Sequence, residues 1–148
     1  MTDDCPGCGT GDGPPVPSAA CAERALVVAE REFSDPAYFA VHRITVAAYT
    51  LQHPASSSGH AVAVHLAALR GAVEQGLDAD ALGRHVRWAS DALRRRPTGP
   101  LVPPARRGAL TIVDVVAARD AGEHCTLVRR WAAQVREAWR PVADMPEV

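Results

Sequence analysis

Hydrophobic and polar positions recur with the period of a helix in several segments of this chain, and the first follows a stretch rich in glycine and proline. Over residues 19–33, Leu26, Ala29 and Phe33 are spaced as on one helical face. Ser18 stands where its hydroxyl can cap the first turn. We therefore expect a helix with these apolar residues facing the core. The charged residues expected to face outward are Glu23, Arg24, Glu30 and Arg31.

A second helical pattern runs over residues 36–53. Ser34 or Asp35 can cap it, and Pro36 falls at the first helical position, where its missing N–H is harmless. A proline and three serines then end the pattern. The β-branched run 44–46 leaves a strand as an alternative. The N-terminal signals and the length favour the helix.

The rest of the chain predicts further helices. Their expected ranges are 60–75, ending at Gly76, then 78–95, 111–120, and 122 or 123 to 140. The short helix starts with a capping-box pattern, Thr111 and Asp114. A proline-rich extended loop, residues 94–108, interrupts the series.

The two longest of these later helices have clear apolar faces. In the helix over 78–95 the residues expected inward are Leu82, Val86 and Leu93, with Trp88 as a further core anchor. In the last helix a stripe spaced by four is expected to face the core, namely Leu127, Trp131, Val135 and Trp139. Three arginines are expected to lie away from that stripe, namely Arg129, Arg130 and Arg136.

These elements predict an all-α fold, a compact bundle of five or six helices with an irregular, Cys-containing N-terminal arm. The arm, residues 1–18, carries a CxxC motif, and residues 19–148 form a single helical domain. The hydrophobic fraction is 47% but aromatic residues make up only 5%, so alanine, valine and leucine supply most of the core. Such a composition favours helices packed closely through small side chains.

Charge and composition narrow the possible surroundings. The formal net charge of −1 gives no reason to expect a nucleic-acid partner, and no apolar run is long enough to span a membrane. The acidic start, Asp3 and Asp4, is unlike a secretory signal. We therefore expect a cytoplasmic protein, in which cysteines serve as metal ligands or reactive thiols rather than in disulfides.

The motif CPGCG at residues 5–9 is typical of a zinc knuckle, because Pro and Gly form a tight turn that directs both thiols to one side. Zinc requires four ligands, so Cys5 and Cys8 supply half of a site. Helical geometry brings Cys21 close to the end of the second helix and to the third, where His53 and His65 lie. The expected metal ligands are thus Cys5, Cys8 and Cys21 with one histidine, His53 before His65. A redox CxxC pair, or an arm with no site, remain as alternatives.

Two further histidines have more than one interpretation. His42 and His53 are about 16 Å apart along one straight helix, so they cannot share a metal ion. His42 either bonds a carboxylate or carbonyl at a helix junction or lines a pocket. His124 either pairs with Asp120 or Glu123 or lines the same cleft as His42. Cys125 is expected to be a spectator thiol.

Several motifs resemble a bacterial family of unknown function, DUF5946, over nearly the whole chain. They are CPGCG, Cys21, DPAYFAVHRITVAAYTLQHP (residues 35–54), VAVHL (62–66), LTIVDVVAARDAGEH (110–124) and VRRWAAQVREAW (128–139). The chain departs from the family at Ala47, where members often have Asp, and at Cys125, where Ala is expected. The resemblance implies membership but no reaction.

Three functions are compatible with these features. The first is a small protein whose zinc ion is structural and which acts as a binding or regulatory module, toward an unknown protein or small-molecule partner. The second is a metal-dependent enzyme whose zinc keeps an open position for water. The third is a thiol-based redox sensor that releases zinc on oxidation. The sequence identifies no catalytic residue.

Overall fold

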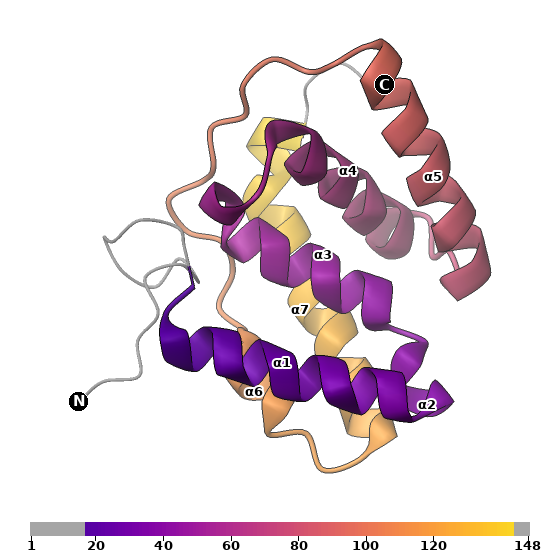
Figure 1. The fold of residues 1–148 in the computed structure, drawn as a ribbon, viewed down its shortest axis with the longest axis vertical. Coiled ribbons are helices and arrows are strands. Elements are labelled where there is room, and N and C mark those ends of the chain that lie inside the picture. Colours follow the sequence, from indigo (N-terminus) through magenta and orange to yellow (C-terminus); the bar gives the residue numbers. More distant parts are fainter. Residues whose placement is uncertain (1–16, 144–148) are drawn as a thin grey trace.

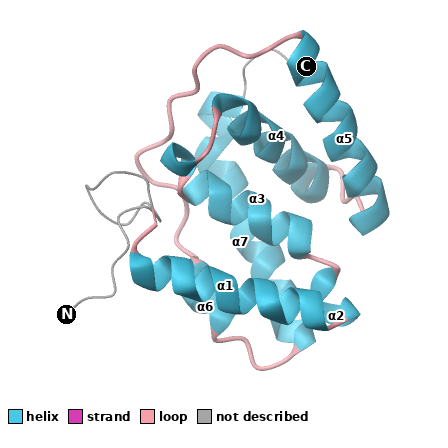
Figure 2. Ribbon diagram, in the orientation of Figure 1, coloured by secondary structure: helices cyan, strands magenta, loops and turns pink. Residues whose placement is uncertain are grey.

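The computed structural model describes residues 17–143, which form a bundle of α-helices (Figures 1 and 2). The α-helices are α1 (Ala19–Ser34), α2 (Pro36–Phe39), α3 (His42–Gln52), α4 (Gly59–Leu69), α5 (Ala79–Arg95), α6 (Ile112–Val116) and α7 (Ala121–Ala143). A 3-10 helix, η2 (Pro54–Ser56), follows α3, and a π-helix, η3 (Arg70–Glu74), continues α4. The all-α fold class is confirmed. Within residues 17–143 there is no strand, and no helix has the length and apolar character needed to cross a membrane.

Side-chain caps begin most of the helices, and those of Ser18, Asp35 and the pair Thr111 and Asp114 are the ones that the sequence predicts. The Ser18 hydroxyl accepts from the Cys21 amide at the start of α1, and the Asp35 carboxylate accepts from the Ala37 amide at the start of α2. Ser58 and Asp78 cap α4 and α5, and Thr111 and Asp114 form a reciprocal capping box at α6. Each cap satisfies amides that have no partner within the helix. The start of each of these helices is therefore determined by residues close to it in sequence.

The helix expected over residues 36–53 is broken in two. The chain leaves the helical path at Val41, which has φ −108° and ψ 7°. The break separates α2 from α3, so there are more helices than the five or six expected. It also places Val41 fully in the core and His42 beside α1. A tertiary requirement thus overrides a continuous helical pattern.

The core lies between α3, α4 and α7, and α7 crosses behind α3 in Figure 1. The apolar stripe of α7 is confirmed, because Trp131, Val135 and Trp139 are fully buried and Leu127 is partly buried against the same core. Small residues on α3, Ala47 and Ala48, let the large α7 side chains approach closely. The indole of Trp139 also donates to the Leu51 carbonyl at 3.0 Å.

The expected apolar face of α1 is wrong. Leu26 and Phe33 are 71% and 68% exposed, whereas Cys21, Val28 and Glu32 are buried. The true buried stripe contains a charged residue, so its apolar pattern is interrupted. A buried carboxylate is stable only with polar partners, and these come from helices far along the chain.

Two further expectations about exposure are wrong. Arg136 is buried, because its guanidinium pairs with the Glu74 carboxylate at 2.7 Å. Trp88 is more than half exposed and stacks on the His85 ring, with centroids 5.7 Å apart. The helical pattern gives the angular position of a residue on its helix but not what covers that position.

Candidate functional site

The predicted ligands Cys21 and His53 meet at one end of the bundle. Cys21 lies in the first turn of α1, and His53 is the residue that ends α3, so the two come together because α1 and α3 run in opposite directions (Figure 1). The distance between Cys21 Sγ and His53 Nε2 is 3.5 Å. Both side chains are buried, with 1% and 2% exposure.

The hydrogen bonds of His53 determine which ring nitrogen is available. Its Nδ1 donates to the Tyr49 carbonyl oxygen at 2.8 Å, since a carbonyl can only accept. In the neutral ring Nε2 therefore carries the lone pair, and this atom faces the Cys21 sulfur. The Tyr49 ring packs on the imidazole, with centroids 4.3 Å apart, and restricts its rotation. A donor bond from the second nitrogen is the usual arrangement of a metal-ligating histidine.

The other predicted ligands do not join this pair within the described residues. Cys5 and Cys8 lie outside residues 17–143, so the structure does not test them. His65 lies on α4 in the wall of a cavity that His42 and Arg43 also line. Burial and the nearby Arg43 guanidinium lower the pKa of His65. Across residues 17–143, no three Cys, His, Asp or Glu side chains are placed to hold one metal ion.

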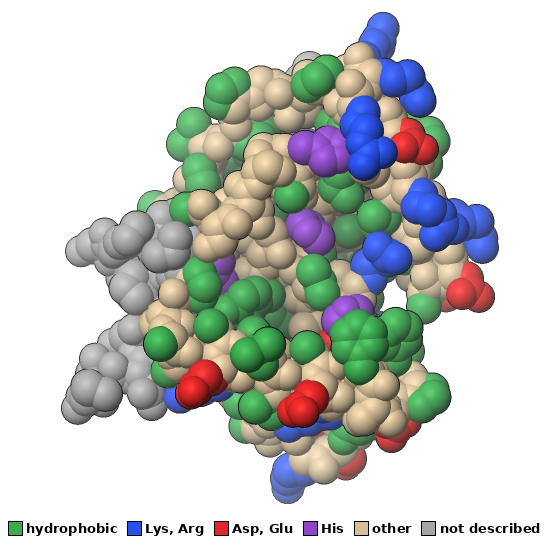
Figure 3. All heavy atoms as spheres, viewed as in Figure 1, with side chains coloured by type: hydrophobic (Ala, Val, Ile, Leu, Met, Phe, Trp, Pro, Cys, Tyr) green, Lys and Arg blue, Asp and Glu red, His purple; other side chains and the backbone are tan. Residues whose placement is uncertain are grey.

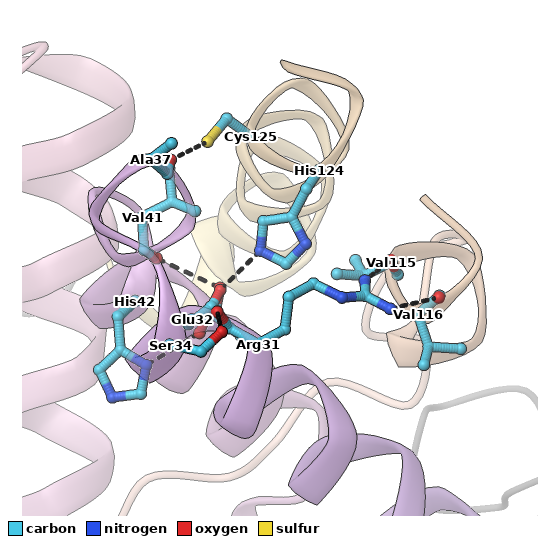
Figure 4. A network of polar contacts seen from close by, with 11 residues as sticks. Arg31, Glu32, Ser34, Ala37, Val41, His42, Val115, Val116, His124 and Cys125 are labelled. Carbon is cyan, nitrogen blue, oxygen red and sulfur yellow. Dashed lines mark hydrogen bonds and ion pairs between the residues drawn. The ribbon is translucent and has the colours of Figure 1, made fainter. Parts of the chain in front are cut away.

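A second polar cluster surrounds Glu32, which is completely buried on α1 (Figure 4). Its carboxylate accepts from His42 Nδ1 at 2.8 Å through one oxygen. The other oxygen accepts from His124 Nε2 at 2.8 Å and from the Thr45 hydroxyl at 2.5 Å. His42 and Thr45 belong to α3, and His124 to α7, so one carboxylate connects three helices. We call Glu32, His42, Thr45 and His124 the Glu32 cluster.

The predicted hydrogen bond from His42 to a carboxylate is confirmed, and His42 also lines a cavity. For His124 one of the two alternatives, a pairing with Asp120 or Glu123, is wrong, because its partner is Glu32. Asp120 instead caps the first turn of α7 by accepting from the Glu123 amide at 2.8 Å. Among the described residues His124 Nδ1 has no hydrogen-bond partner, and the Tyr38 ring packs edge-on at 4.9 Å.

Sequence reasoning missed Glu32 because nothing local distinguishes it from the exposed charges of α1. One signal was available, namely its position eleven residues after Cys21 and four after Val28, on the stripe that is buried. A charge on a buried stripe requires partners, and His42, ten residues further along the chain, could have been identified as one. His124, 92 residues away, could not be assigned without the fold.

Comparison with known proteins gives a single positive result. The model of a family of unknown function, DUF5946, matches residues 3–140 of the 148-residue chain. No curated protein and no solved structure matches it. The match covers the proposed metal ligands and the Glu32 cluster alike. The chain belongs to the DUF5946 family.

Proposed function

We propose that this protein is a small zinc-binding helical module in which Cys5, Cys8, Cys21 and His53 hold a structural zinc ion. The observation that carries the proposal is the 3.5 Å separation of Cys21 Sγ and His53 Nε2. Zinc with bonds of about 2.3 Å to sulfur and about 2.0–2.1 Å to nitrogen in a tetrahedron places its S and N ligands about 3.6 Å apart. The two side chains thus have the spacing of one edge of a zinc tetrahedron.

The orientation of His53 supports the same interpretation. Its Nε2 lone pair faces Cys21, and the bond from Nδ1 to the Tyr49 carbonyl holds the ring in that orientation. Because the described residues offer no third ligand, the remaining two come from elsewhere in the chain. Two cysteines of the chain, Cys5 and Cys8, lie outside residues 17–143, and they precede α1 closely in sequence. The choice between the two histidines falls on His53, since His65 faces another cavity.

Burial of Cys21 and His53 supports a structural rather than a catalytic metal. A catalytic zinc keeps one position open to water and substrate, whereas four protein ligands close the coordination sphere. Both ligands are almost inaccessible at the side of the helix bundle where the arm joins α1. The ion would bind the arm to the ends of α1 and α3 and add its binding free energy to folding. In this proposal the protein acts by binding a protein or small-molecule partner on its helical surface.

Metal analysis of the full chain, purified without chelator, tests this proposal directly. We expect one zinc per chain, and we expect Cys5→Ser and His53→Gln each to lower both the zinc content and the melting temperature. Replacement of zinc by cobalt should give strong thiolate-to-metal charge-transfer absorption, reduced by about one third in Cys5→Ser because one of three thiolates is lost.

Matched variants separate the ligands from other residues of the same type. His65→Gln and Cys125→Ser should keep one zinc per chain, since these side chains lie apart from the Cys21–His53 pair. Wild-type protein without zinc would refute the proposal. Loss of zinc in His65→Gln with retention in His53→Gln would show that the fourth ligand is assigned to the wrong helix. An open, water-accessible metal position would favour the enzyme alternative. Zinc release by peroxide would favour the sensor.

A further inference from the structure

A cavity of about 570 Å³ opens between α3, α4 and α5, on a different part of the bundle from Cys21 and His53. This volume is within the range of small-molecule sites, about 300–1,000 Å³. Figure 3 shows that the face beside α5 is hollowed and that histidine and arginine side chains border the hollow. The charged and titratable residues lining the cavity are Arg43, Arg84, Arg87, Asp80, His42 and His65.

Within residues 17–143 the arginines of this cavity, Arg43, Arg84 and Arg87, form no ion pair with a carboxylate. Gly83 lies on α5, close to the guanidinium groups of Arg87 and Arg43. A Cβ atom on it would be 3.8 Å from Nη1 of Arg87 and 3.9 Å from Nη2 of Arg43. The guanidinium groups of two helices therefore approach the same point, close enough for one anion to contact both. The ion pairs of residues 17–143 involve other arginines, including Arg94, Arg119, Arg136 and Arg140.

The charges in the cavity favour a doubly charged anion. Three arginines against the single carboxylate of Asp80 leave a formal charge of +2 when the histidines are neutral. Clustered cations without counter-ions repel one another, and a bound anion removes that repulsion. A phosphate monoester carries about −1.5 to −2 charges at pH 7, and its oxygens fit the planar fork of Arg.

His42 adds an oriented imidazole at the edge of the cavity. Its Nδ1 bonds the buried Glu32 carboxylate, and its ring stacks on Phe39, with centroids 5.3 Å apart and planes at 12°. Phe33 packs on the same ring at 4.5 Å. Figure 4 shows the second ring nitrogen pointing away from Glu32. This imidazole is thus held by three neighbours, and its remaining nitrogen is available for a ligand.

The lining also provides apolar contacts. Phe39 and Val86 lie in the wall with the arginines, and the cavity is much larger than a phosphate group alone requires. An organic group attached to the phosphate would cover this apolar surface. Burial and, to a smaller extent, the Arg43 guanidinium lower the pKa of His65, which lies in the same wall.

We propose that the cavity between α3, α4 and α5 binds a small phosphate monoester, whose phosphate is held by Arg43 and Arg87 with help from Arg84. The organic group lies against Phe39 and Val86. The site is independent of the proposed zinc ion, since it shares no ligand with it. It would make the protein a binding module for phosphorylated small molecules.

Phenyl phosphate is a suitable probe, and isothermal titration calorimetry on the full chain measures its binding. We expect saturable binding with one site, weakened at least about tenfold by Arg43→Ala or by Arg87→Ala, because each removes a charged hydrogen-bond donor to the anion. Arg130→Ala on the exposed surface of α7 is the matched control and should bind as the wild type does. Circular dichroism confirms that each variant is folded.

A second pair of variants tests the geometry at Gly83. Gly83→Glu introduces a carboxylate between the two guanidinium groups and should abolish phenyl phosphate binding, whereas Gly83→Ala should retain it. Absence of binding at millimolar phenyl phosphate would overturn the proposal, as would binding that Arg43→Ala and Arg87→Ala leave unchanged. Tighter binding of benzoate than of phenyl phosphate would overturn the assignment to phosphate monoesters.

Discussion

Removal of the Glu32 carboxylate should strongly destabilise the fold. Glu32→Ala removes the acceptor for His42 Nδ1, His124 Nε2 and the Thr45 hydroxyl at once. His124 is fully buried, and among the described residues its Nδ1 has no hydrogen-bond partner. The bond from Nε2 to Glu32 is therefore the one that its imidazole makes with these residues, and the substitution removes it. A buried donor left without its acceptor costs about 1–3 kcal/mol, so the loss of the partners of this cluster together costs about 3–5 kcal/mol. We expect Glu32→Ala to lower the free energy of unfolding by about that amount.

This loss is large compared with the stability of a domain, about 5–15 kcal/mol. At about 3–4 °C per kcal/mol for a chain of this size, the melting temperature should fall by about 10–20 °C. Urea denaturation followed by circular dichroism measures the change in free energy, and differential scanning calorimetry measures the melting temperature.

Two variants on the same helix calibrate the result. Glu32→Gln keeps the shape and one acceptor oxygen, and His124 can adapt by moving its proton to Nδ1, so the cost should be smaller, about 1–3 kcal/mol. Glu30→Ala, on the exposed side of α1, should change stability by less than about 0.5 kcal/mol. A cost below about 1 kcal/mol for Glu32→Ala would refute the view that this carboxylate holds α1, α3 and α7 together.

Two other predictions concern glycines and a thiol. Gly83→Ala should raise the free energy of unfolding by about 0.5–1 kcal/mol in urea titrations, because alanine favours the helix and the added Cβ meets only ordinary contacts. Gly71→Ala should lower it instead, since its Cβ would lie 2.9 Å from Cδ2 of His85; equal effects of the two substitutions would contradict this contact. Burial raises the pKa of the Cys125 thiol, so its thiolate is scarce at neutral pH and alkylation by iodoacetamide should be slower than that of a free cysteine. The rate should rise at a higher pH than for the free amino acid, and mass spectrometry of the Cys125 peptide measures it; a rate equal to that of free cysteine would exclude the shift.

Much of the helical architecture could be predicted because its signals are local. Ser18, Asp78 and the pair Thr111 and Asp114 start helices by bonding amides within three residues. The stripe ending in Trp139 buries itself because side chains four residues apart lie on one helical face. For the candidate metal site, the spacing of Cys21 and His53 on antiparallel helices was enough to predict that they meet.

Several features could not be predicted because they depend on distant partners. Leu26 and Phe33 resemble core residues in periodicity, yet they are exposed while Glu32 is buried. The break before His42 interrupts a pattern that is helical throughout, and it brings His42 to Glu32. Arg136 is buried only because Glu74 lies opposite it.

The sequence by itself determined that the described chain is helical, where most helices begin, and that Cys21 and His53 lie at one end of the bundle; it did not separate His53 from His65. These properties follow from hydrogen bonds and side-chain spacing within a few turns. Only the tertiary structure decided which face of α1 is buried, which histidines share the Glu32 carboxylate, and that Arg43 and Arg87 converge beside Gly83. The physical reason is that a charged side chain is stable in the interior, or available for a ligand, according to partners supplied by other helices, and no local pattern encodes those partners.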